Sequence, residues 1–295
     1  MDIIQVENLS KRYGELTAVN HISFGVEEGS MLGFLGINGA GKTTAINMLS
    51  TLLRPDEGTA RICGHLLGKE DDSIRRNIGI VYQHNCLDDA LTVRENLLCR
   101  GILHGATRQE ARNRLTRLTG LLRLEELLKK RYKTLSGGQK RRCEIAAALM
   151  HTPRVLFLDE PTTGLDPATR KDVWQIIETL RSEENTTIFL TTHYMEEAAA
   201  ADRILILDHG EIIASGTPFA LKERYAKDKL RLYHEPGVVI PGTPTPYGTE
   251  VTLNATMEAL PIVNKFCSQI RGFEVIQGTM DDVFLNALSR QEVAQ

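Results

Sequence analysis

Hydrophobic residues follow two different spacings along this chain, and these spacings predict its elements. Short apolar runs bounded by turn residues are typical of strands. They occur at residues 3–7, 21–26, 31–35, 78–82, 155–158, 187–190 and 204–207. Apolar residues at helical spacing predict helices at residues 42–53, 168–182 and 195–201. Strands that alternate with helices indicate an α/β fold with a parallel sheet covered on both faces.

The hydrophobic pattern changes at two places along the chain. Between residues 92 and 128, leucines recur at helical spacing with arginines and glutamates between them, which predicts a helical insertion. A boundary is expected at residues 216–218. Beyond it the pattern predicts a small second α/β domain with a proline-rich loop at 236–246. Its expected elements are strands at 230–233, 251–253 and 273–276, and helices at 221–225, 259–270 and from 279 onward.

Bulk composition is that of an ordinary globular chain. The 295 residues are 42% hydrophobic and 25% charged, and this length suggests about two domains. The net charge of -3 gives no basic field, and we expect no nucleic-acid partner. The apolar runs are far shorter than the ~20 residues of a membrane span, and no signal peptide is evident. If the protein serves transport, another polypeptide is expected to cross the membrane.

Cysteine and histidine usage indicates no structural metal and no disulfide framework. The five cysteines form no C-x-x-C pair and the eight histidines show no ligand spacing, so reduced thiols are expected. The basic run Lys140, Arg141 and Arg142 lies on a predicted helix. Because the overall balance is acidic, we interpret this run as a solvated face rather than a nucleic-acid contact.

A glycine-rich segment joins the strand predicted at 31–35 to the helix that follows. It contains Gly36, Ile37, Asn38, Gly39, Ala40, Gly41, Lys42, Thr43 and Thr44. The glycines allow the backbone to bend around phosphates and direct N–H groups inward, beside a helix N-terminus that favours anions. Lys42 supplies a cation for the β- and γ-phosphates, and the Thr43 hydroxyl suits Mg²⁺. This is a complete phosphate-binding loop for a nucleoside triphosphate.

Two carboxylates end the apolar strand predicted at 155–158. A buried strand delivers Asp159 to the carboxyl edge of the sheet, where it can hold Mg²⁺ through water. Glu160 follows at once and points differently. It is placed to polarise the water that attacks the γ-phosphorus. In isolation, two acids after a hydrophobic run are more often a solvated strand end. Downstream of a full phosphate loop, the catalytic interpretation is favoured.

A second anion-binding turn lies about a hundred residues after the first. Ser136, Gly137, Gly138 and Gln139 begin a helix, with Ser136 as a good N-cap and glycine N–H groups at a positive helix end. With the phosphate loop, this motif resembles the ATP-binding cassette (ABC) family, the ATPases that drive ABC transporters. The resemblance covers residues 1–216. It implies a P-loop cassette with a mixed sheet core and a helical subdomain at about 84–150, followed by the accessory domain at 217–295.

The resemblance also implies roles for single residues. Tyr13 matches an aromatic that stacks on adenine, and Gln83 matches a glutamine that touches Mg²⁺ or water and senses the transporter. His193 matches the histidine that contacts the γ-phosphate, and Asp166 lies in a loop that runs between two cassettes. The turn from Ser136 is implied to close over ATP held by an opposing cassette. ATP, Mg²⁺ and a second copy are therefore the expected partners.

The C-terminal segment from Gly278 to Leu285 is similar to the end of drug-resistance export subunits of the ABC-2 type, and residues 92–97 resemble that subfamily too. This implies an ATP-hydrolysing subunit on the cytoplasmic face of the membrane, bound to a permease and powering efflux of a drug or other amphiphile. Two alternatives stay open: a soluble ABC mechanoenzyme that acts on ribosomes or DNA, and a nucleotide-gated scaffold.

Overall fold

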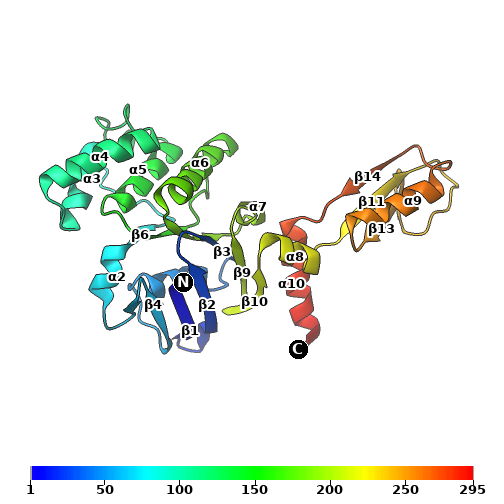
Figure 1. Cartoon of the computed structure of the whole chain (residues 1–295), viewed down its shortest axis with the longest axis horizontal. Coiled ribbons are helices and arrows are strands. Elements are labelled where there is room, and N and C mark those ends of the chain that lie inside the picture. Colours follow the sequence, from blue (N-terminus) through cyan, green and yellow to red (C-terminus); the bar gives the residue numbers. More distant parts are fainter. Residues whose placement is uncertain (1, 295) are drawn as a thin grey trace. The chain divides into compact units, whose positions relative to one another are not determined.

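The structure is a computed structural model that describes the backbone of residues 2–294 and the side chains of residues 2–289. The chain forms two compact units. The first contains Met1–His193 and Ala201–Ile212, and the second contains Tyr194–Ala200 and Ile213–Gln295. Figure 1 traces both units along the sequence. Of the helices in residues 2–294, none has both the length and the apolar composition that a bilayer crossing requires.

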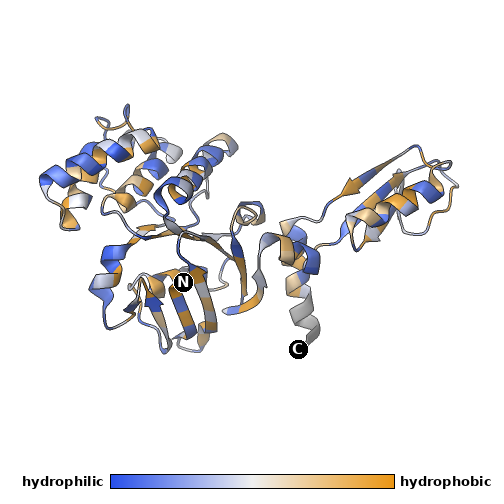
Figure 2. Ribbon diagram, in the orientation of Figure 1, coloured by the Kyte–Doolittle hydropathy of each residue, from blue (hydrophilic) through white to orange (hydrophobic). Residues whose placement is uncertain are grey.

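An antiparallel sheet opens the first unit. Its strand order is β2-β1-β4-β5, formed by β1 (Asp2–Tyr13), β2 (Leu16–Glu27), β4 (Glu57–Ile62) and β5 (His65–Leu66). Buried and exposed residues alternate along β2, with Ile22, Phe24 and Val26 facing the core. Figure 2 shows the same alternation as bands of hydrophobic and hydrophilic colour on these strands. One sheet face therefore contributes to the core and the other faces solvent.

A second sheet carries the site. Its order is β10-β9-β3-β8-β7-β6, formed by β3 (Met31–Leu35), β6 (Ile78–Val81), β7 (Val155–Asp159), β8 (Thr187–Thr192), β9 (Arg203–Asp208) and β10 (Glu211–Gly216). The five strands from β9 to β6 run parallel. Every residue of β3, β7 and β8 is buried, as expected for central parallel strands. Their carboxyl ends meet at one edge of the sheet.

Helices flank these sheets. They are α1 (Lys42–Leu49), α2 (Asp71–Asn77), α3 (Val93–Leu103), α4 (Arg108–Leu122), the short η1 (Tyr132–Thr134), α5 (Gly137–Leu149) and α6 (Pro167–Glu184). In Figure 1, α3, α4 and α5 form one helical group, and α3 packs on both others. Capping boxes at Thr92, Thr107 and Ser136 start these three helices. The core centres on the rings of Phe24, Phe34, Phe157 and Phe189.

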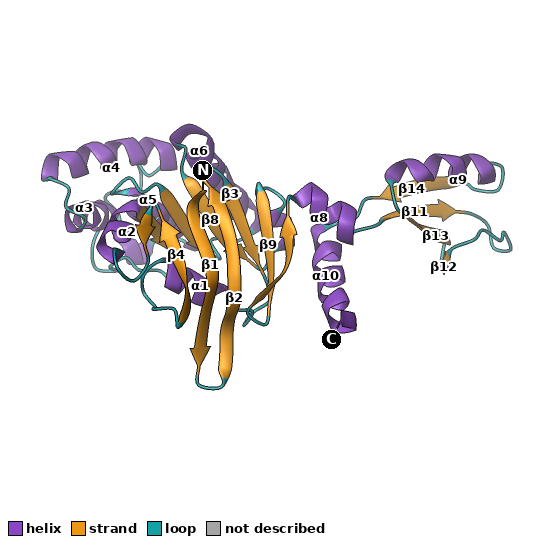
Figure 3. Ribbon diagram, turned by 60° about the horizontal axis from the view of Figure 1, so that its bottom comes forward, coloured by secondary structure: helices purple, strands orange, loops and turns teal. Residues whose placement is uncertain are grey.

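The second unit contains α7 (Met195–Ala198), α8 (Pro218–Tyr225), η2 (Thr256–Glu258), α9 (Ala259–Phe266) and α10 (Met280–Ala294). Its antiparallel sheet has the order β12-β13-β11-β14, from β12 (Thr243–Thr245), β13 (Gly248–Leu253), β11 (Asp228–Tyr233) and β14 (Gly272–Ile276). Figure 3 shows α9 lying along this sheet. Leu230 and Leu232 are fully buried in the core that α9 helps to form.

Several expectations need correction. The loop expected at 236–246 contains the strand β12, because Pro244 occupies an edge strand, where a missing N–H costs no ladder hydrogen bond. The sequence patterns also gave no expectation for β4, β5, α2 and β10. The helix expected at 195–201 is only four residues long.

Candidate functional site

The phosphate loop connects β3 to α1, and its glycines adopt a backbone that other residues avoid. Gly39 and Gly41 have φ values of 88° and 105°. A Cβ atom on Gly41 would lie 2.2 Å from the carbonyl oxygen of Ala18, so no larger residue fits there. Gly41 is also the N-cap of α1, whose first N–H groups therefore adjoin the turn. This geometry suits an anion.

Lys42 is held inside this loop by the chain's own oxygens. Its Nζ donates hydrogen bonds to the carbonyls of Gly36 (2.8 Å) and Ile37 (3.1 Å). It also lies 3.7 Å from Oε1 of Glu160. Burial lowers the pKa of Lys42, an effect that Glu160 and Asp159 oppose. The ammonium is thus poised to exchange carbonyl partners for phosphate oxygens.

Asp159 ends β7 among hydroxyl donors. Oδ1 accepts a hydrogen bond from the Thr191 hydroxyl at 2.6 Å, and Oδ2 accepts one from the Thr43 hydroxyl at 3.4 Å. Burial raises the pKa of Asp159; the Thr191 hydrogen bond lowers it and the Glu160 charge raises it further. The structure therefore brings together Thr43 and Asp159, two of the three residues that the sequence predicts for Mg²⁺, with hard oxygen donors facing each other.

Glu160 is the hub of the site. Its Oε2 accepts hydrogen bonds from the Gln83 amide (3.2 Å) and the Thr163 hydroxyl (3.0 Å), and lies 3.2 Å from Nδ1 of His193. Its backbone is left-handed, with φ of 46°, which few residues other than glycine adopt. The backbone N–H donates to the Thr191 carbonyl. Thr163 is a site residue for which the sequence patterns gave no signal.

The other predicted binding residues differ in exposure. Ala40 is buried, Thr44 is partly buried and Asn38 is exposed at the tip of the turn. Tyr13 ends β1 with 49% of its surface exposed, and the Lys11 ammonium lies 6.0 Å from its ring centre. An exposed aromatic ring can stack on a base.

The turn at Ser136 is built from its own residues. The Ser136 hydroxyl accepts from the Gln139 N–H at 3.4 Å, and the Gln139 side-chain oxygen accepts from the Ser136 N–H at 3.1 Å. Gly138 lies against Thr169, because a Cβ there would meet the Thr169 methyl at 2.0 Å. Asp166 caps α6 by accepting from the N–H groups of Ala168 and Thr169. The hydrogen bond from the Thr169 hydroxyl lowers the pKa of Asp166 most.

The interpretation of residues 140–142 as a solvated face is wrong for Arg141. This side chain is only 5% exposed, and its guanidinium donates to the carbonyls of Tyr82 (2.6 Å) and Gln83 (3.2 Å). Residues 82–87 form an irregular segment whose carbonyls need donors, and a long-range partner of this kind leaves no trace in local charge spacing.

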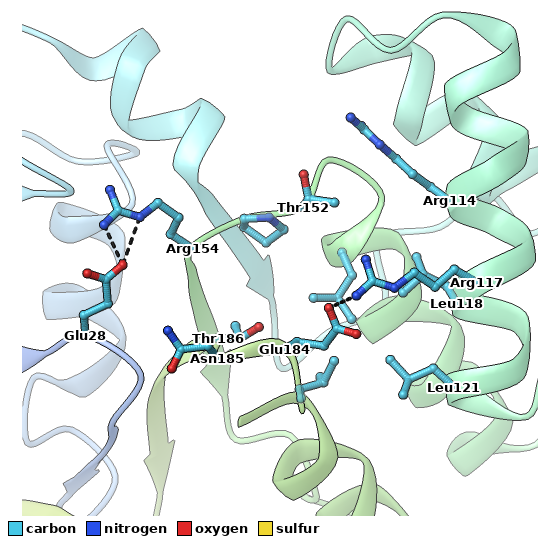
Figure 4. Close-up of a pocket in the computed structure, with 13 residues that line it drawn as sticks. Glu28, Arg114, Arg117, Leu118, Leu121, Thr152, Arg154, Glu184, Asn185 and Thr186 are labelled. Atoms are coloured by element: carbon cyan, nitrogen blue, oxygen red, sulfur yellow. Dashed lines mark hydrogen bonds and ion pairs between the residues drawn. The ribbon is translucent and has the colours of Figure 1, made fainter. Parts of the chain in front are cut away.

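A cavity of about 300 Å³ lies away from these residues (Figure 4). It is lined by Leu149 and Glu184, the last residues of α5 and α6, whose first turns carry the motifs at Ser136 and Asp166. Figure 4 shows the ion pairs of Arg117 with Glu184 and of Arg154 with Glu28 among the lining residues. None of its lining residues belongs to the predicted site.

A phosphate loop between β3 and α1, with paired carboxylates at the end of β7, two strands away in the same sheet, defines a P-loop nucleoside triphosphatase. The sequence profile of the ABC transporter family matches residues 19–163. The daunorubicin/doxorubicin resistance ATP-binding protein DrrA of Streptomyces peucetius is 40% identical, over 96% of this chain and 91% of that protein. The linearmycin resistance ATP-binding protein LnrL of Bacillus subtilis (strain 168) is 42% identical, over 77% of this chain and 73% of that protein.

Solved structures agree. A dimeric post-hydrolysis state of the ATP-binding cassette MJ0796, bound to ADP and Pi, has a TM-score of 0.66 and 29% identity. That comparison covers 73% of this chain and 98% of the cassette. The chain belongs to the ABC transporter family, in the drug-resistance group of ATP-binding subunits. It is an ATP-binding ATPase that serves transport, and the expected cassette fold is confirmed. The comparisons give no support to the soluble ribosome-acting alternative.

Proposed function

We propose that two copies of this chain close over two MgATP and drive export of an amphiphilic molecule through an ABC-2 type permease. The observation that carries the proposal is the preformed cluster around Glu160, where Lys42, Gln83, Thr163 and His193 converge within 3.7 Å of its carboxylate oxygens. Such a cluster has the carboxylate base, cation and amide that water attack on a phosphoryl group requires.

In this mechanism Glu160 polarises the attacking water. The Gln83 and Thr163 hydrogen bonds orient its carboxylate, and the left-handed backbone holds it apart from Asp159. Lys42 moves from the Gly36 and Ile37 carbonyls to the phosphates. His193 lies on the same side as the Glu160 carboxylate, where it can donate to the γ-phosphate.

The donor set near Asp159 fits Mg²⁺. Protein sites for this ion commonly supply one or two oxygen ligands and leave the rest to phosphates and water. The hydroxyl of Thr43 and the carboxylate of Asp159 are such donors, and Gln83 is the third residue assigned here. Among the side chains of residues 2–289, no group of three or more His, Cys, Asp or Glu could hold a metal by itself. When bound, the ion neutralises charge on the transferred phosphoryl group.

A second copy completes each site. The turn at Ser136 is exposed, and its glycine N–H groups lie at the start of a 13-residue helix, whose dipole favours an anion. This supports placement of the turn over the γ-phosphate of an opposing copy, with Asp166 in the loop between the copies. In this proposal the permease crosses the bilayer. The chain binds the permease and so lies peripherally on the cytoplasmic face of the membrane.

A groove beside the helical group supports docking of the permease. A cavity of about 220 Å³ is lined by Leu52, Tyr82, Arg100 and His104, among others. Leu52 is 60% exposed, and the adjacent helix α3 ends at Leu103, which is 79% exposed. Exposed apolar residues around a groove favour a partner segment. The proposed occupant is a cytoplasmic helix of the permease.

The proposal is tested with the chain and a permease of this type in inside-out vesicles. ATP-dependent accumulation of a fluorescent anthracycline is expected with the wild-type chain, and Lys42→Ala should abolish it. In parallel, Glu160→Gln should sediment as an ATP-dependent dimer. Absence of accumulation together with ATPase stimulation by ribosomes or DNA would instead favour the soluble mechanoenzyme. A monomer at saturating ATP would refute the two-copy closure.

A further inference from the structure

The helix α5 connects two functional segments of the same chain. It begins at the Ser136 turn, and its second and third turns meet the irregular segment 82–87, which contains Gln83. Arg141 makes the first contact by donating to the carbonyls of Tyr82 and Gln83 at 2.6 and 3.2 Å. The two hydrogen bonds hold adjacent peptide groups with one planar guanidinium, which fixes their orientation as well as their distance.

Glu144 makes the second contact, one helical turn later. It is 6% exposed, and its Oε1 accepts from the N–H groups of Cys86 (2.8 Å) and Leu87 (3.1 Å). The buried Tyr132 hydroxyl donates to the same oxygen at 2.6 Å. Burial and the hydrogen bond to Glu144 both raise the pKa of Tyr132, so this hydroxyl stays a donor. Three donors on one buried carboxylate oxygen offset its desolvation.

These contacts fix the segment because it has no regular secondary structure of its own. Four of its backbone groups, two carbonyls and two N–H groups, are bonded to Arg141 and Glu144. The Gln83 amide meanwhile reaches Glu160 at 3.2 Å. A chain of hydrogen bonds therefore runs from Glu160 through the segment to α5, and the rigid helix continues to Ser136.

We propose that Arg141 and Glu144 are positioning residues that make the Gln83 segment and α5 move as one body. A shift of the segment then shifts the Ser136 turn of the same chain, and so controls closure over the ATP of the opposing copy. Glu144 also lines the groove assigned above to the permease, together with Tyr82 and Cys86. A helix entering that groove would meet Glu144 and the segment that it holds. This inference rests on the proposed two-copy function.

The test uses the full chain with Glu160→Gln, which is expected to form the closed dimer. The concentration of ATP that half-saturates dimerisation is measured by sedimentation, and the affinity of the monomer for ATP is measured at low protein concentration. Glu144→Gln and Arg141→Gln should each raise the half-saturating ATP concentration about tenfold. Monomer affinity should change less than twofold, because the phosphate loop is untouched.

Matched variants separate positioning from folding. Arg142→Gln is the control, because the neighbouring Arg142 donates instead to the Arg123 carbonyl. Its dimerisation should match the parent. Arg141→Lys keeps one donor and should restore part of the lost closure, and Tyr132→Phe removes a single hydroxyl and should shift closure two- to threefold. These two variants decide the matter if Arg141→Gln or Glu144→Gln fails to fold.

Combining two substitutions distinguishes a positioning role from a loss of packing, because packing alone would not couple the effects of the two. When Gln83→Ala is already present, adding Arg141→Gln should raise the half-saturating ATP concentration by less than twofold. The reason is that the segment then no longer reaches the side chain at position 160. The inference is overturned if the effects of Gln83→Ala and Arg141→Gln are fully additive. It is also overturned if Glu144→Gln and Arg141→Gln dimerise at the parent's ATP concentration. Either result leaves the two-copy function standing. A parent that stays monomeric overturns both.

Discussion

The phosphate site and the Ser136 turn are both anion sites, yet they are built in opposite ways. Lys42, Asp159 and Glu160 are 4–7% exposed and come from two elements far apart in the sequence, joined by partners from further segments. The Ser136 turn is exposed, and its capping bonds come from within four consecutive residues. The first is a preorganised pocket that depends on the tertiary fold. The second is a local surface that we propose closes over the ATP of an opposing copy.

Removing the carboxylate at the centre of the buried site should have the largest effect. Glu160→Gln keeps the shape and the contacts with Gln83 and Thr163, yet it cannot polarise water. Turnover is expected to fall about 10²–10⁴-fold, the usual contribution of a positioned base. Phosphate release at saturating ATP measures it, with ATP affinity as the control. Turnover within tenfold of the wild type would remove Glu160 from this role.

Loss of the buried cation should weaken binding rather than chemistry alone. Lys42→Ala deletes charge-assisted hydrogen bonds worth roughly 1.5–3 kcal/mol, or about 10–100-fold in the dissociation constant for ATP. The rise in melting temperature that ATP produces should be lost as well. Calorimetric titration gives the affinity. Lys140→Ala is the control, since this lysine lies on α5, outside the phosphate loop. An equal loss of ATP affinity in that variant would contradict the role of the buried cation.

Blocking the exposed turn should spare the pocket. Ser136→Arg puts bulk at the face that meets the other copy, so ATP-dependent dimers should disappear and turnover should drop about tenfold or more, while the monomer binds ATP as before. Sedimentation in the Glu160→Gln background is the measurement. Ser136→Thr keeps a capping hydroxyl and should still dimerise. Dimers of normal affinity with Ser136→Arg would mean that the turn does not face a second copy.

The smallest effect is expected at the opposite end of α5. His151 donates from Nε2 to the Ile78 carbonyl and stacks on His104 with ring centres 4.0 Å apart. Burial lowers the pKa of His151 to about 4, helped by the charges of His104 and Arg114. The unfolded chain therefore binds more protons between pH 4 and 6.5. The stability linked to this histidine is present above pH 6.5 and is lost as pH falls toward 4.

His151→Gln should accordingly flatten the pH dependence of the unfolding free energy by about 1–3 kcal/mol between pH 7.5 and 4.5. Urea denaturation at several pH values measures it. His209→Gln is the matched control, because the His209 side chain is 90% exposed. ATP binding at pH 7.5 should be unchanged in both. A slope identical to the wild type in His151→Gln would show that another group carries the acid sensitivity.

Sequence patterns were informative where function needs fixed spacing. The order of Lys42, Thr43, Asp159 and Glu160 is dictated by a strand, a turn and a helix, and each of these leaves a local mark. The hydrophobic pattern of the strand β4 is weak, because only Ala60 and Ile62 of its six residues are buried. Its pairing with β1 is a long-range contact that no window of sequence contains.

The site partners that escaped prediction share this cause. Thr163 and Arg141 act through neighbours that only the fold supplies, and a threonine in a turn or an arginine in a basic run has an ordinary local explanation. The small second unit follows the same rule, since β11, β13 and β14 were expected but β12, which depends on its pairing with β13, was not. The roles of the individual site residues and the domain boundary at 216 stay predictions.

The left-handed backbone at Glu160 carries one more consequence. A non-glycine residue in this conformation costs about 1–3 kcal/mol of folding free energy. Asparagine tolerates such a backbone better than glutamate does. Glu160→Asn should therefore yield a cassette that resists heat more than the wild type while hydrolysing almost nothing. The backbone conformation of Glu160 thus lowers the thermal stability of the protein, while its carboxylate is what turnover requires.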